Sequence, residues 1–421
     1  MSKFSTLWRS EEWWAVWIGL LILGLVATGA ITMVPKVSKW TSIEAAVKPL
    51  DALYMIPLAV GLLILTAIPV LTEKKDVKKY LVGFPVIFFL AFLSQLIADQ
   101  VIVNQYGISY ALWALIFGLV ISNVGKTPKF LQAAAKSELF IKTGLVILGA
   151  EILFEVIMKA GARGLFEVTV GLALVWYFTY YLAVKLGLKK TFAAIMANAT
   201  AVCGVSAAIA AGGAVKGSKE EISYVVSIVL LFAAPLTVIM PIIGRIFQIP
   251  DAIFGAWMGG FIDNTASVVA TGALYSDAAM QVASIVKMSQ NILIGITAFL
   301  LALYWVLKVE RKPSQEKPKP VEIWYRFPKF IVGFLIASLV FSFVLVPTLG
   351  ANAVDGLTKI TKGFTGWFFA LTFVSIGLQT NFRELIKIGK GKPLLVFLAA
   401  TAWDMVLSLI AAIIFFSGMT L

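Results

Sequence analysis

The sequence has no histidine and a single cysteine, Cys203, among its 421 residues. A lone cysteine excludes an internal disulfide framework. The absence of histidine excludes Ser-His-Asp and Cys-His catalysis. Zinc and other transition metals are held mainly by Cys and His, so we expect no such metal, no cofactor and no enzymatic activity.

Charged side chains are also scarce, at 14% of the residues, whereas 60% of the residues are hydrophobic. A soluble domain of this length needs a more strongly charged surface, so most of this surface must face lipid. A net charge of +13 would suggest a nucleic-acid partner in a soluble protein. Here the Lys and Arg residues form short clusters between apolar stretches, which favours a membrane protein and argues against nucleic acid.

Long apolar stretches follow one another along the whole chain. A bilayer core of about 30 Å requires about 20 apolar residues in a helix. The pattern predicts an all-α polytopic membrane protein, with about 13 transmembrane helices forming one transmembrane domain over residues 1–421. Residues 309–327 combine Pro with mixed charge and are predicted to be a cytoplasmic linker between spans ten and eleven. The predicted spans are residues 13–34, 52–72, 81–103, 109–123, 139–158, 164–186, 192–213, 221–247, 252–274, 279–307, 328–348, 364–380 and 393–417.

The distribution of Lys and Arg predicts the orientation of these spans. With the N-terminus in the cytoplasm, the cytoplasmic segments hold 25 of the 35 Lys and Arg residues and the outer segments hold 9. The remaining cation, Lys287, lies inside a span. This asymmetry follows the positive-inside rule and predicts a multi-pass membrane protein with the N-terminus in the cytoplasm and the C-terminus outside.

A weak internal repeat relates residues 148–161 to residues 376–389. Four positions are identical without gaps, and they begin with Gly149 and Phe154, which match Gly377 and Phe382. The copies lie in spans five and twelve, so their orientations are expected to be opposite, as in the inverted repeats of secondary transporters. A chance match in a biased composition is the alternative.

The seventh predicted span carries small and polar residues where a lipid-facing helix would carry Leu and Phe. Asn, Thr and Ser offer hydrogen-bond donors and acceptors, and Gly lets the backbone approach a ligand. A helix broken here would expose N–H groups that suit an anion, although close packing of small residues is the alternative interpretation. The residues concerned are Asn198, Thr200, Cys203, Gly204 and Ser206.

Two ionisable residues lie inside neighbouring spans, Asp263 in the ninth and Lys287 in the tenth. A charge at this depth costs on the order of 3 kcal/mol, and such residues are commonly functional. We interpret the two as a substrate-binding or proton-coupling pair, the alternative being an ion pair that only locks two helices. Asp404 and Glu151 are further acids in spans that could join this network. The polar neighbours proposed for the same site are Asn264, Ser267, Gln290 and Asn291.

The sequence from Cys203 to Ala208 resembles the Cys-Gly-x-Ser-Ala signature of the sulfate exporter family of bacterial and archaeal inner-membrane proteins. Residues 262–272 and 285–288 resemble two further patterns of that family, and the resemblance runs from about residue 110 to the C-terminus. Three positions differ, because Asp263, Asn264 and Ser267 stand where the family has His, Glu and Gln. These departures leave the substrate open, and sulfate itself is only the label of the family.

The family is similar to the wider cation/proton antiporter group, which implies inverted repeats and interrupted helices that cross at the membrane midplane. The predicted topology makes spans seven and nine parallel, whereas crossed broken helices of an inverted repeat are antiparallel. A re-entrant hairpin at one of the two segments, or a misaligned repeat, would resolve this difference.

Together these observations predict a secondary transporter for a small anion, coupled to H⁺ or Na⁺, embedded in the lipid bilayer and homodimeric by analogy. In this prediction Lys287 supplies positive charge, and Asp263 holds Lys287 in place or carries a proton. The first alternative is a monovalent cation/proton antiporter that uses Asp263. The second is a membrane-embedded enzyme or a structural subunit, which the missing catalytic motifs disfavour.

Overall fold

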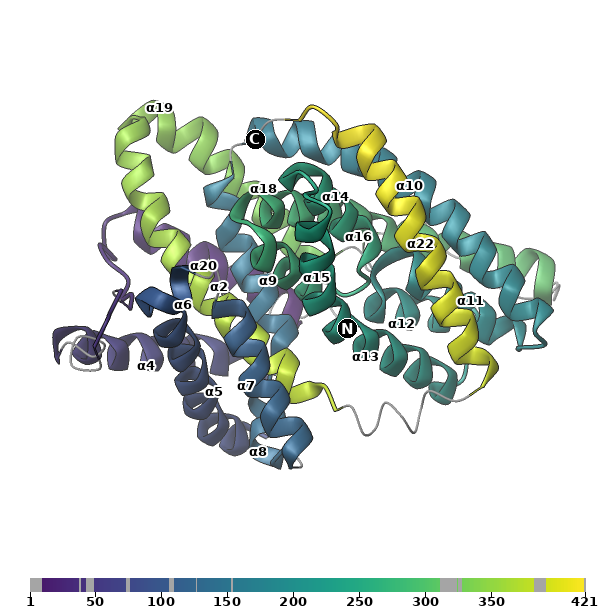
Figure 1. Ribbon diagram of the computed structural model, residues 1–421, viewed down its shortest axis with the longest axis horizontal. Helices are drawn as coiled ribbons and strands as arrows, with labels where there is room; N and C mark the ends of the chain where they lie inside the picture. The colour runs from purple at the N-terminus through teal and green to yellow at the C-terminus, as the bar shows by residue number, and fades with distance from the viewer. Residues whose placement is uncertain are drawn as a thin grey trace. The chain divides into compact units, whose positions relative to one another are not determined.

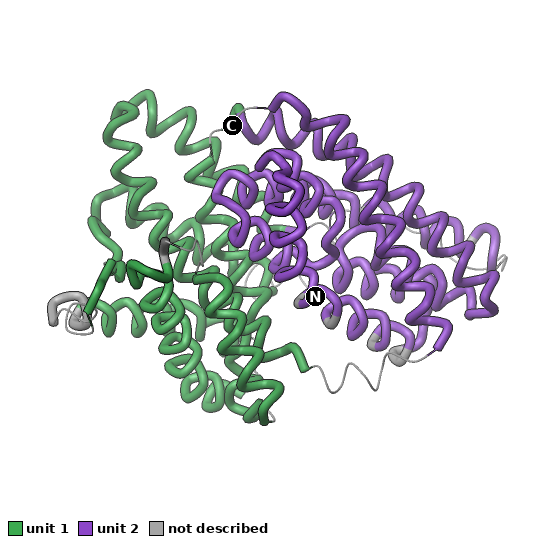
Figure 2. The backbone as a smooth tube through the Cα atoms, viewed as in Figure 1, with its two compact units in different colours: residues 1–155, 329–381 green, residues 156–328, 382–421 purple. Residues whose placement is uncertain are grey.

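The computed structural model describes most of the chain, and its contacts divide it into two compact units (Figure 2). Unit 1 comprises residues 1–155 and 329–381, and unit 2 comprises residues 156–328 and 382–421. The predicted linker at 309–327 falls almost entirely outside the described residues, and the prediction of one domain stays a prediction. The described residues are 10–37, 39–42, 49–72, 76–105, 110–125, 127–152, 154–310, 324, 328–381 and 391–419.

Unit 1 is built from helices that come from the first third of the chain and from a later segment (Figure 1). The later segment is one long helix preceded by shorter helical pieces. The helices are α2 (Glu11–Ala27), α4 (Pro49–Thr72), α5 (Val77–Ala98), α6 (Val101–Gln105), α7 (Tyr110–Val124), α8 (Lys129–Ala134), α9 (Ser137–Leu148), η1 (Gly149–Glu151), α18 (Lys329–Val340), η4 (Phe341–Leu345), α19 (Val346–Leu349) and α20 (Ala351–Gln379).

Unit 2 alternates long helices with pairs of short ones (Figure 1). The short helices come in two pairs, and each pair follows a long helix. The helices are α10 (Phe154–Lys185), α11 (Lys190–Asn198), η2 (Ala199–Cys203), α12 (Val205–Ala214), α13 (Lys219–Ile246), α14 (Asp251–Phe261), α15 (Thr265–Tyr275), α16 (Asp277–Tyr304), η3 (Trp305–Glu310) and α22 (Lys392–Phe416).

The predicted class, an all-α polytopic membrane protein, is confirmed by the helices of the structure. Seven of the described helices are long and apolar enough to cross a membrane by themselves, and several shorter helices are also apolar. Helices suit this environment because every backbone group within a helix is paired without help from water. The start of α10 differs from the prediction, since this helix begins at residue 154 and the predicted span at residue 164.

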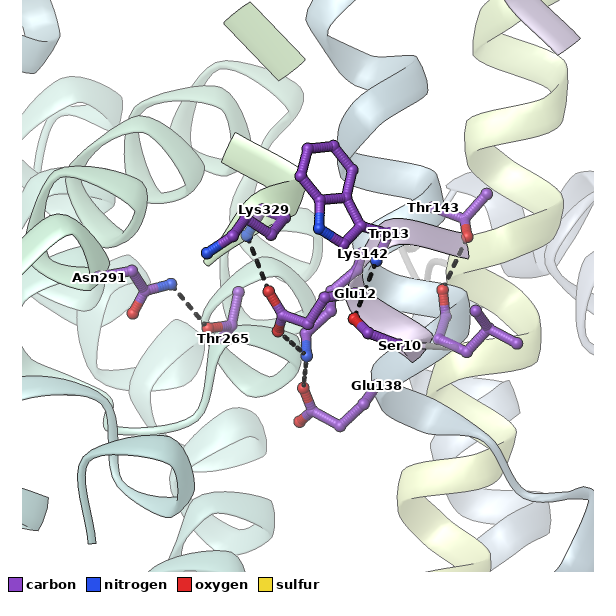
Figure 3. Close-up of polar contacts among 10 residues, drawn as sticks. Ser10, Glu12, Trp13, Glu138, Lys142, Thr143, Thr265, Asn291 and Lys329 are labelled. Atoms are coloured by element: carbon purple, nitrogen blue, oxygen red, sulfur yellow. Dashed lines mark hydrogen bonds and ion pairs between the residues drawn. The ribbon is translucent and has the colours of Figure 1, made fainter. Parts of the chain in front are cut away.

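A half-buried polar network ties three helices of unit 1 together (Figure 3). The Glu12 carboxylate on α2 accepts a hydrogen bond from Lys142 Nζ on α9 at 2.6 Å. Its other oxygen accepts from the backbone N–H of Lys329 at 2.8 Å, at the start of α18. Glu138 is a second acidic partner of Lys142, at 3.3 Å. The network therefore gives acidic partners to a lysine, which needs a counter-charge, and to the N-terminus of α18, whose free N–H groups carry partial positive charge.

The segment predicted as span seven folds back on itself as two short helices. Asn198 Nδ2 on α11 donates to the carbonyl oxygen of Ala207 on α12 at 3.0 Å. In one continuous helix, nine residues would separate these groups by about 13 Å along the axis. Thr191, at the start of α11, donates to Glu221 at the start of α13 at 2.9 Å. Helices α11 and α12 thus form a helical hairpin, called hairpin A (residues 190–214), whose two ends lie together.

The segment predicted as span nine is a second hairpin, called hairpin B (residues 251–275). Its first arm, α14, runs parallel to α16, because Gly255 packs against Ala279 and the Gly260 carbonyl accepts from Gln290 further along α16. The chain then leaves helical geometry at Ile262, whose backbone is extended, and α15 begins after Asn264.

The second arm of hairpin B, α15, runs antiparallel to α16. Its first residue, Thr265, accepts a hydrogen bond from Asn291 at 3.2 Å, whereas Gly272 near its end packs against Met280 at the start of α16. The two arms therefore point in opposite directions along the same helix. With 11 residues each, the arms span about 16 Å, roughly half of a bilayer core.

Helix α13 shows that the two hairpins begin at opposite ends of unit 2. Hairpin A ends where α13 starts, at a capping box formed by Ser218 and Glu221. Hairpin B has its ends at the other end of α13, because Arg245 donates to the carbonyls of Leu274 and Tyr275 at 3.1 Å. The tips of both hairpins therefore lie between the ends of α13. Spans seven and nine are therefore not two parallel helices, because each segment folds back on itself.

We expect the two ends of each hairpin to face the same side of the membrane. The test uses single-cysteine variants in a Cys203→Ser background, labelled with a membrane-impermeant maleimide. Lys189→Cys and Lys216→Cys, which flank hairpin A, should react from one side, because both lie at the base of the hairpin. Gln248→Cys and Asp277→Cys, which flank hairpin B, should react from the other side. Opposite accessibility within either pair would show that the segment crosses the membrane.

The weak repeat coincides with the places where the chain passes from unit 1 into unit 2. In the first copy, α9 ends at Leu148, a short 3₁₀ turn follows, and α10 begins at Phe154. The passage lies after residue 155 in this copy and after residue 381 near the start of the second copy. Residues 382–389 of the second copy lie outside the described residues. The two copies therefore begin at equivalent points of the chain's path.

Candidate functional site

The tips of the two hairpins meet at Gly204 and Asp263. Gly204 separates η2 from α12 and has φ +61° and ψ −101°, a conformation that residues with a Cβ rarely adopt. A Cβ built on Gly204 would lie 3.2 Å from the Asp263 Cβ and 2.5 Å from Val229 Cγ1 on α13. The absence of a side chain at residue 204 is therefore what allows the tip of hairpin A to approach the tip of hairpin B.

Lys287 on α16 lies beside this meeting point and is completely buried, with 0% of its surface exposed. Its Nζ donates to the carbonyl oxygen of Val202 at 3.0 Å, at the tip of hairpin A. It also donates to Gln290 Oε1 on its own helix at 2.5 Å. Because a broken helix leaves carbonyl groups without helical partners, the ammonium group satisfies one of them. No carboxylate lies within ion-pair distance of Lys287 in the part of the chain that the structure describes.

Gln290 connects the two tips. Its Nε2 donates to the carbonyl of Ala201 in hairpin A at 3.3 Å and to the carbonyl of Gly260 in hairpin B at 3.1 Å. The same side chain accepts from Lys287, so each end of its amide group is used. One helix, α16, thus holds both broken backbones with two neighbouring side chains.

Three predicted residues have buried polar atoms without a hydrogen-bond partner among the described residues. These atoms are Asn198 Oδ1, Ser267 Oγ and Asn291 Oδ1. Buried polar groups are nearly always paired, so unpaired ones mark places where a ligand or water would bind. The neighbouring Asn264 is already used, because its side chain accepts from the Ser267 backbone N–H at 3.0 Å and caps α15.

Among the predicted site residues, Thr200 and Ser206 do not offer a free polar group to the meeting point of the tips. The Thr200 hydroxyl is buried and bonds to the Met196 carbonyl at 3.1 Å, and its oxygen lies 3.3 Å from the Thr179 hydroxyl on α10. Its polar group is therefore occupied by the fold. Ser206 lies on an exposed face of α12 together with Ile209. Cys203 is buried at the tip of hairpin A.

Asp263 is half-buried at the tip of hairpin B, and its charge attracts that of Lys287. The predicted direct ion pair between them does not occur among the described contacts, since Lys287 bonds to Val202 and Gln290 instead. The positive ends of α12 and α15 also lie at these tips, because both helices begin there. The N-terminus of α12 has no side-chain cap. The charges at the tips therefore favour an anion near Lys287.

Sequence reasoning missed Glu167 on α10, which is 2% exposed. The expected start of this span at residue 164 made Glu167 look like a residue of the helix end. The helix begins at residue 154, so Glu167 lies well inside it. Glu167 feels the negative charge of Asp404 on α22, one of the acids expected to join the network. The second acid, Glu151, lies in unit 1 and accepts from Thr365 at 2.5 Å.

Comparison with known proteins places the chain among membrane proteins. A sequence model of the family described as conserved hypothetical protein 698 matches residues 82–397. A UPF0324 membrane protein of Rhodopirellula baltica is 42% identical over 392 residues, which cover 90% of this chain and 71% of that protein. One from Nitratidesulfovibrio vulgaris is 38% identical over 403 residues, covering 90% and 69%. One from Nitrosomonas europaea is 32% identical over 449 residues, covering 92% of each chain.

Proposed function

The chain belongs to the family described as conserved hypothetical protein 698, and from this premise we propose that it is a secondary transporter for a small anion. The anion class is that of sulfate and sulfonates, which the resemblance to the sulfate exporter family suggests. The names of the relatives state a membrane protein and no substrate. The proposal therefore depends on the site in unit 2.

One observation carries the proposal, namely the buried Lys287 at the point where two hairpin tips meet. A buried ammonium with no carboxylate within ion-pair distance is unfavourable, and an anion bound beside it would pair with it directly. Helix N-termini at the same place add partial positive charge and N–H donors. Asn198 and Asn291 each donate one amide N–H to Ala207 or Thr265, so the second N–H of each amide would be the donor available to the anion, whereas their unpaired oxygens would accept from water.

The hairpins also suggest how the site would be opened. Hairpin A and hairpin B enter unit 2 from opposite ends of α13, so each tip separates the site from one side. Displacement of one tip at a time would expose the anion to one side and keep the other side closed, as alternating access requires. Asp263 would compete with the anion for the positive charge of Lys287 and so favour release of the anion.

The hairpins improve the agreement with the positive-inside rule. If both return to the side from which they enter, Lys216 and Lys219 join the cytoplasmic segments and Arg245 moves to the outer side. The split of 25 to 9 then becomes 26 to 8. All later segments keep their sides, because the two hairpins compensate for each other. We therefore propose an inner-membrane protein with a cytoplasmic N-terminus and an outer C-terminus.

A second candidate function is monovalent cation/proton antiport. The observation that favours it is the excess of acids around the buried Lys287, where Asp263, Glu167 and Asp404 lie within one electrostatic network. In that case Asp263 would bind the cation, and Asp263→Asn would abolish transport while Lys287 would serve only to hold the tips together.

Ligand-dependent thermal stabilisation of the detergent-purified protein tests the two functions. The panel contains sulfate, sulfite, thiosulfate, taurine, small carboxylates, Na⁺ and Li⁺, each at two pH values. A ligand present at 100 times its Kd raises the free energy of unfolding by about 2.7 kcal/mol. We expect a shift with an anion that Lys287→Ala eliminates. A shift with Na⁺ or Li⁺ alone, lost in Asp263→Asn, would replace the anion proposal with the cation antiporter.

A further inference from the structure

A pair of buried acids lies on two long helices of unit 2, Glu167 on α10 and Asp404 on α22. They are 2% and 5% exposed. Neither carboxylate oxygen of Glu167 has a hydrogen-bond partner in the described part of the chain. Asp404 Oδ1 accepts from Ser408 Oγ at 2.8 Å, one turn further along α22. Arg163, one turn before Glu167 on α10, is exposed, and the described contacts contain no ion pair between the two.

The two acids converge on the backbone of hairpin B. A Cβ built on Gly260 would lie 3.1 Å from Glu167 Oε1 and 3.5 Å from Ser408 Oγ, the partner of Asp404. The carbonyl of Gly260 accepts from Gln290, which in turn accepts from Lys287. Glu167 therefore lies directly beside Gly260, and Asp404 reaches the same residue through Ser408; Gly260 also connects this arm to Gln290 and so to Lys287.

The charged groups around the pair do not neutralise two carboxylates. The field at Asp404 comes from Asp263 at the tip of hairpin B and from Lys287 on α16, and Glu167 feels Asp404. One lysine thus faces three acids. An ionised carboxylate without a partner in an apolar interior is strongly unfavourable, and two neighbouring buried carboxylates do not both ionise. A proton bound to one carboxyl oxygen removes the unfavourable negative charge and needs no other ligand.

A proton fits the pair better than a metal cation does. Na⁺ would need several oxygen ligands arranged around one point. A proton needs only one carboxylate oxygen, and Glu167 has two without partners. The proton arrives from water on one side, forms an O–H bond with the carboxylate and leaves to water on the other side.

We propose that Glu167 and Asp404 are the proton-carrying pair that couples proton movement to anion movement through Gly260 and Gln290. This inference rests on the proposed anion transport and names its coupling ion. An anion bound near Lys287 cancels the positive charge that the acids feel, so it favours the protonated form of the pair. Proton and anion therefore bind together and move in the same direction.

Proteoliposomes that contain the full-length protein test the inference. Labelled sulfate reports anion flux, and a trapped pH dye reports proton flux. In the wild type we expect an inward sulfate gradient to carry protons inward at a fixed ratio. In Glu167→Gln and in Asp404→Asn we expect this ratio to fall at least tenfold, because an amide cannot carry the proton. Glu155→Gln, an exposed carboxylate on the same helix, is the matched control and should keep the wild-type ratio.

The failure of each proposal has its own result. Absence of sulfate flux and of sulfate exchange in the wild type contradicts the proposed function itself. Sulfate flux that follows a Na⁺ gradient, or a proton-to-sulfate ratio that survives in both variants, overturns the inference alone. If a variant carries no sulfate, calorimetry in two buffers of different ionisation enthalpy measures proton uptake when sulfate binds to wild type. No proton uptake there also overturns the inference.

Discussion

Replacing Lys287 with methionine is expected to reduce anion transport by roughly tenfold to a hundredfold. The side chain is completely buried, and its Nζ supplies the positive charge where the hairpin tips meet. Hydrogen bonds to a charged group contribute about 1.5–3 kcal/mol, and 3 kcal/mol corresponds to roughly a hundredfold in affinity. The measurement is the initial rate of labelled sulfate uptake into proteoliposomes. Lys185→Met, an exposed lysine of unit 2, is the control and should transport at the wild-type rate.

The double variant Asp263→Asn/Lys287→Met separates a binding role from a structural one. Removing the lysine alone leaves Asp263 without the charge that attracts it, which by itself could destabilise the hairpin tips. The double variant removes both charges, so its thermal stability should recover towards the wild type. Transport should remain lost, because the anion still lacks its cation. Recovery of transport together with stability would mean that Lys287 serves only the fold.

Replacing Gly204 with alanine is the second change with a large expected effect. A left-handed backbone costs a residue with a Cβ about 1–2 kcal/mol. The new Cβ would also lie 2.5 Å from Val229 Cγ1, a side chain that is itself completely buried, and overpacking costs about 1–3 kcal/mol. We therefore expect a loss of about 3 kcal/mol in unfolding free energy, and transport should fall with it because the hairpin tips separate. Thermal unfolding and sulfate uptake are the two measurements.

A second substitution divides this effect into its parts. In Gly204→Ala/Val229→Ala the close contact is gone, so only the backbone strain should remain. Gly213→Ala is the matched control in the same hairpin, because a Cβ at this position would meet nothing within 4 Å. Alanine also favours a helix over glycine by about 1 kcal/mol, so this variant should be at least as stable as the wild type. Equal losses in Gly204→Ala and Gly213→Ala would contradict the role assigned to the tip.

The sequence predicted the class of the fold and the segments of the site, because both depend on composition. Apolar length identified the membrane segments, and the small residues around Gly204 identified an unusual one. The folding back of hairpin A was not predictable, because a hydropathy profile measures apolar length and carries no direction. A hairpin with arms of half the bilayer thickness has the same profile as one crossing helix. Contacts between the arms and at their ends, such as the bonds from Asn198 to Ala207 and from Thr191 to Glu221, distinguish the two.

The misses within the site have equally specific causes. Glu167 was overlooked because the predicted start of its helix was ten residues late, which placed a central residue near an end. The pairing of Asp263 with Lys287 was proposed from their positions in adjacent spans. Sequence patterns contain no information on backbone carbonyls freed by a broken helix, and the Val202 carbonyl is the group that Lys287 contacts. Which side chain donates a hydrogen bond to a freed carbonyl is decided by the tertiary structure and cannot be read from the sequence.

The partners of the hairpin tips also set the order in which this protein can be completed during synthesis. The backbone carbonyls of Val202 and Ala201 accept hydrogen bonds from Lys287 and Gln290, which follow 85 and 89 residues later in the chain. When hairpin A leaves the ribosome, the side chains that satisfy its freed carbonyls do not yet exist. Each arm is too short to cross a bilayer by itself, and unpaired carbonyls are costly in lipid. Hairpin A must therefore wait at the membrane surface until α16 has been inserted, and it reaches its final depth only afterwards.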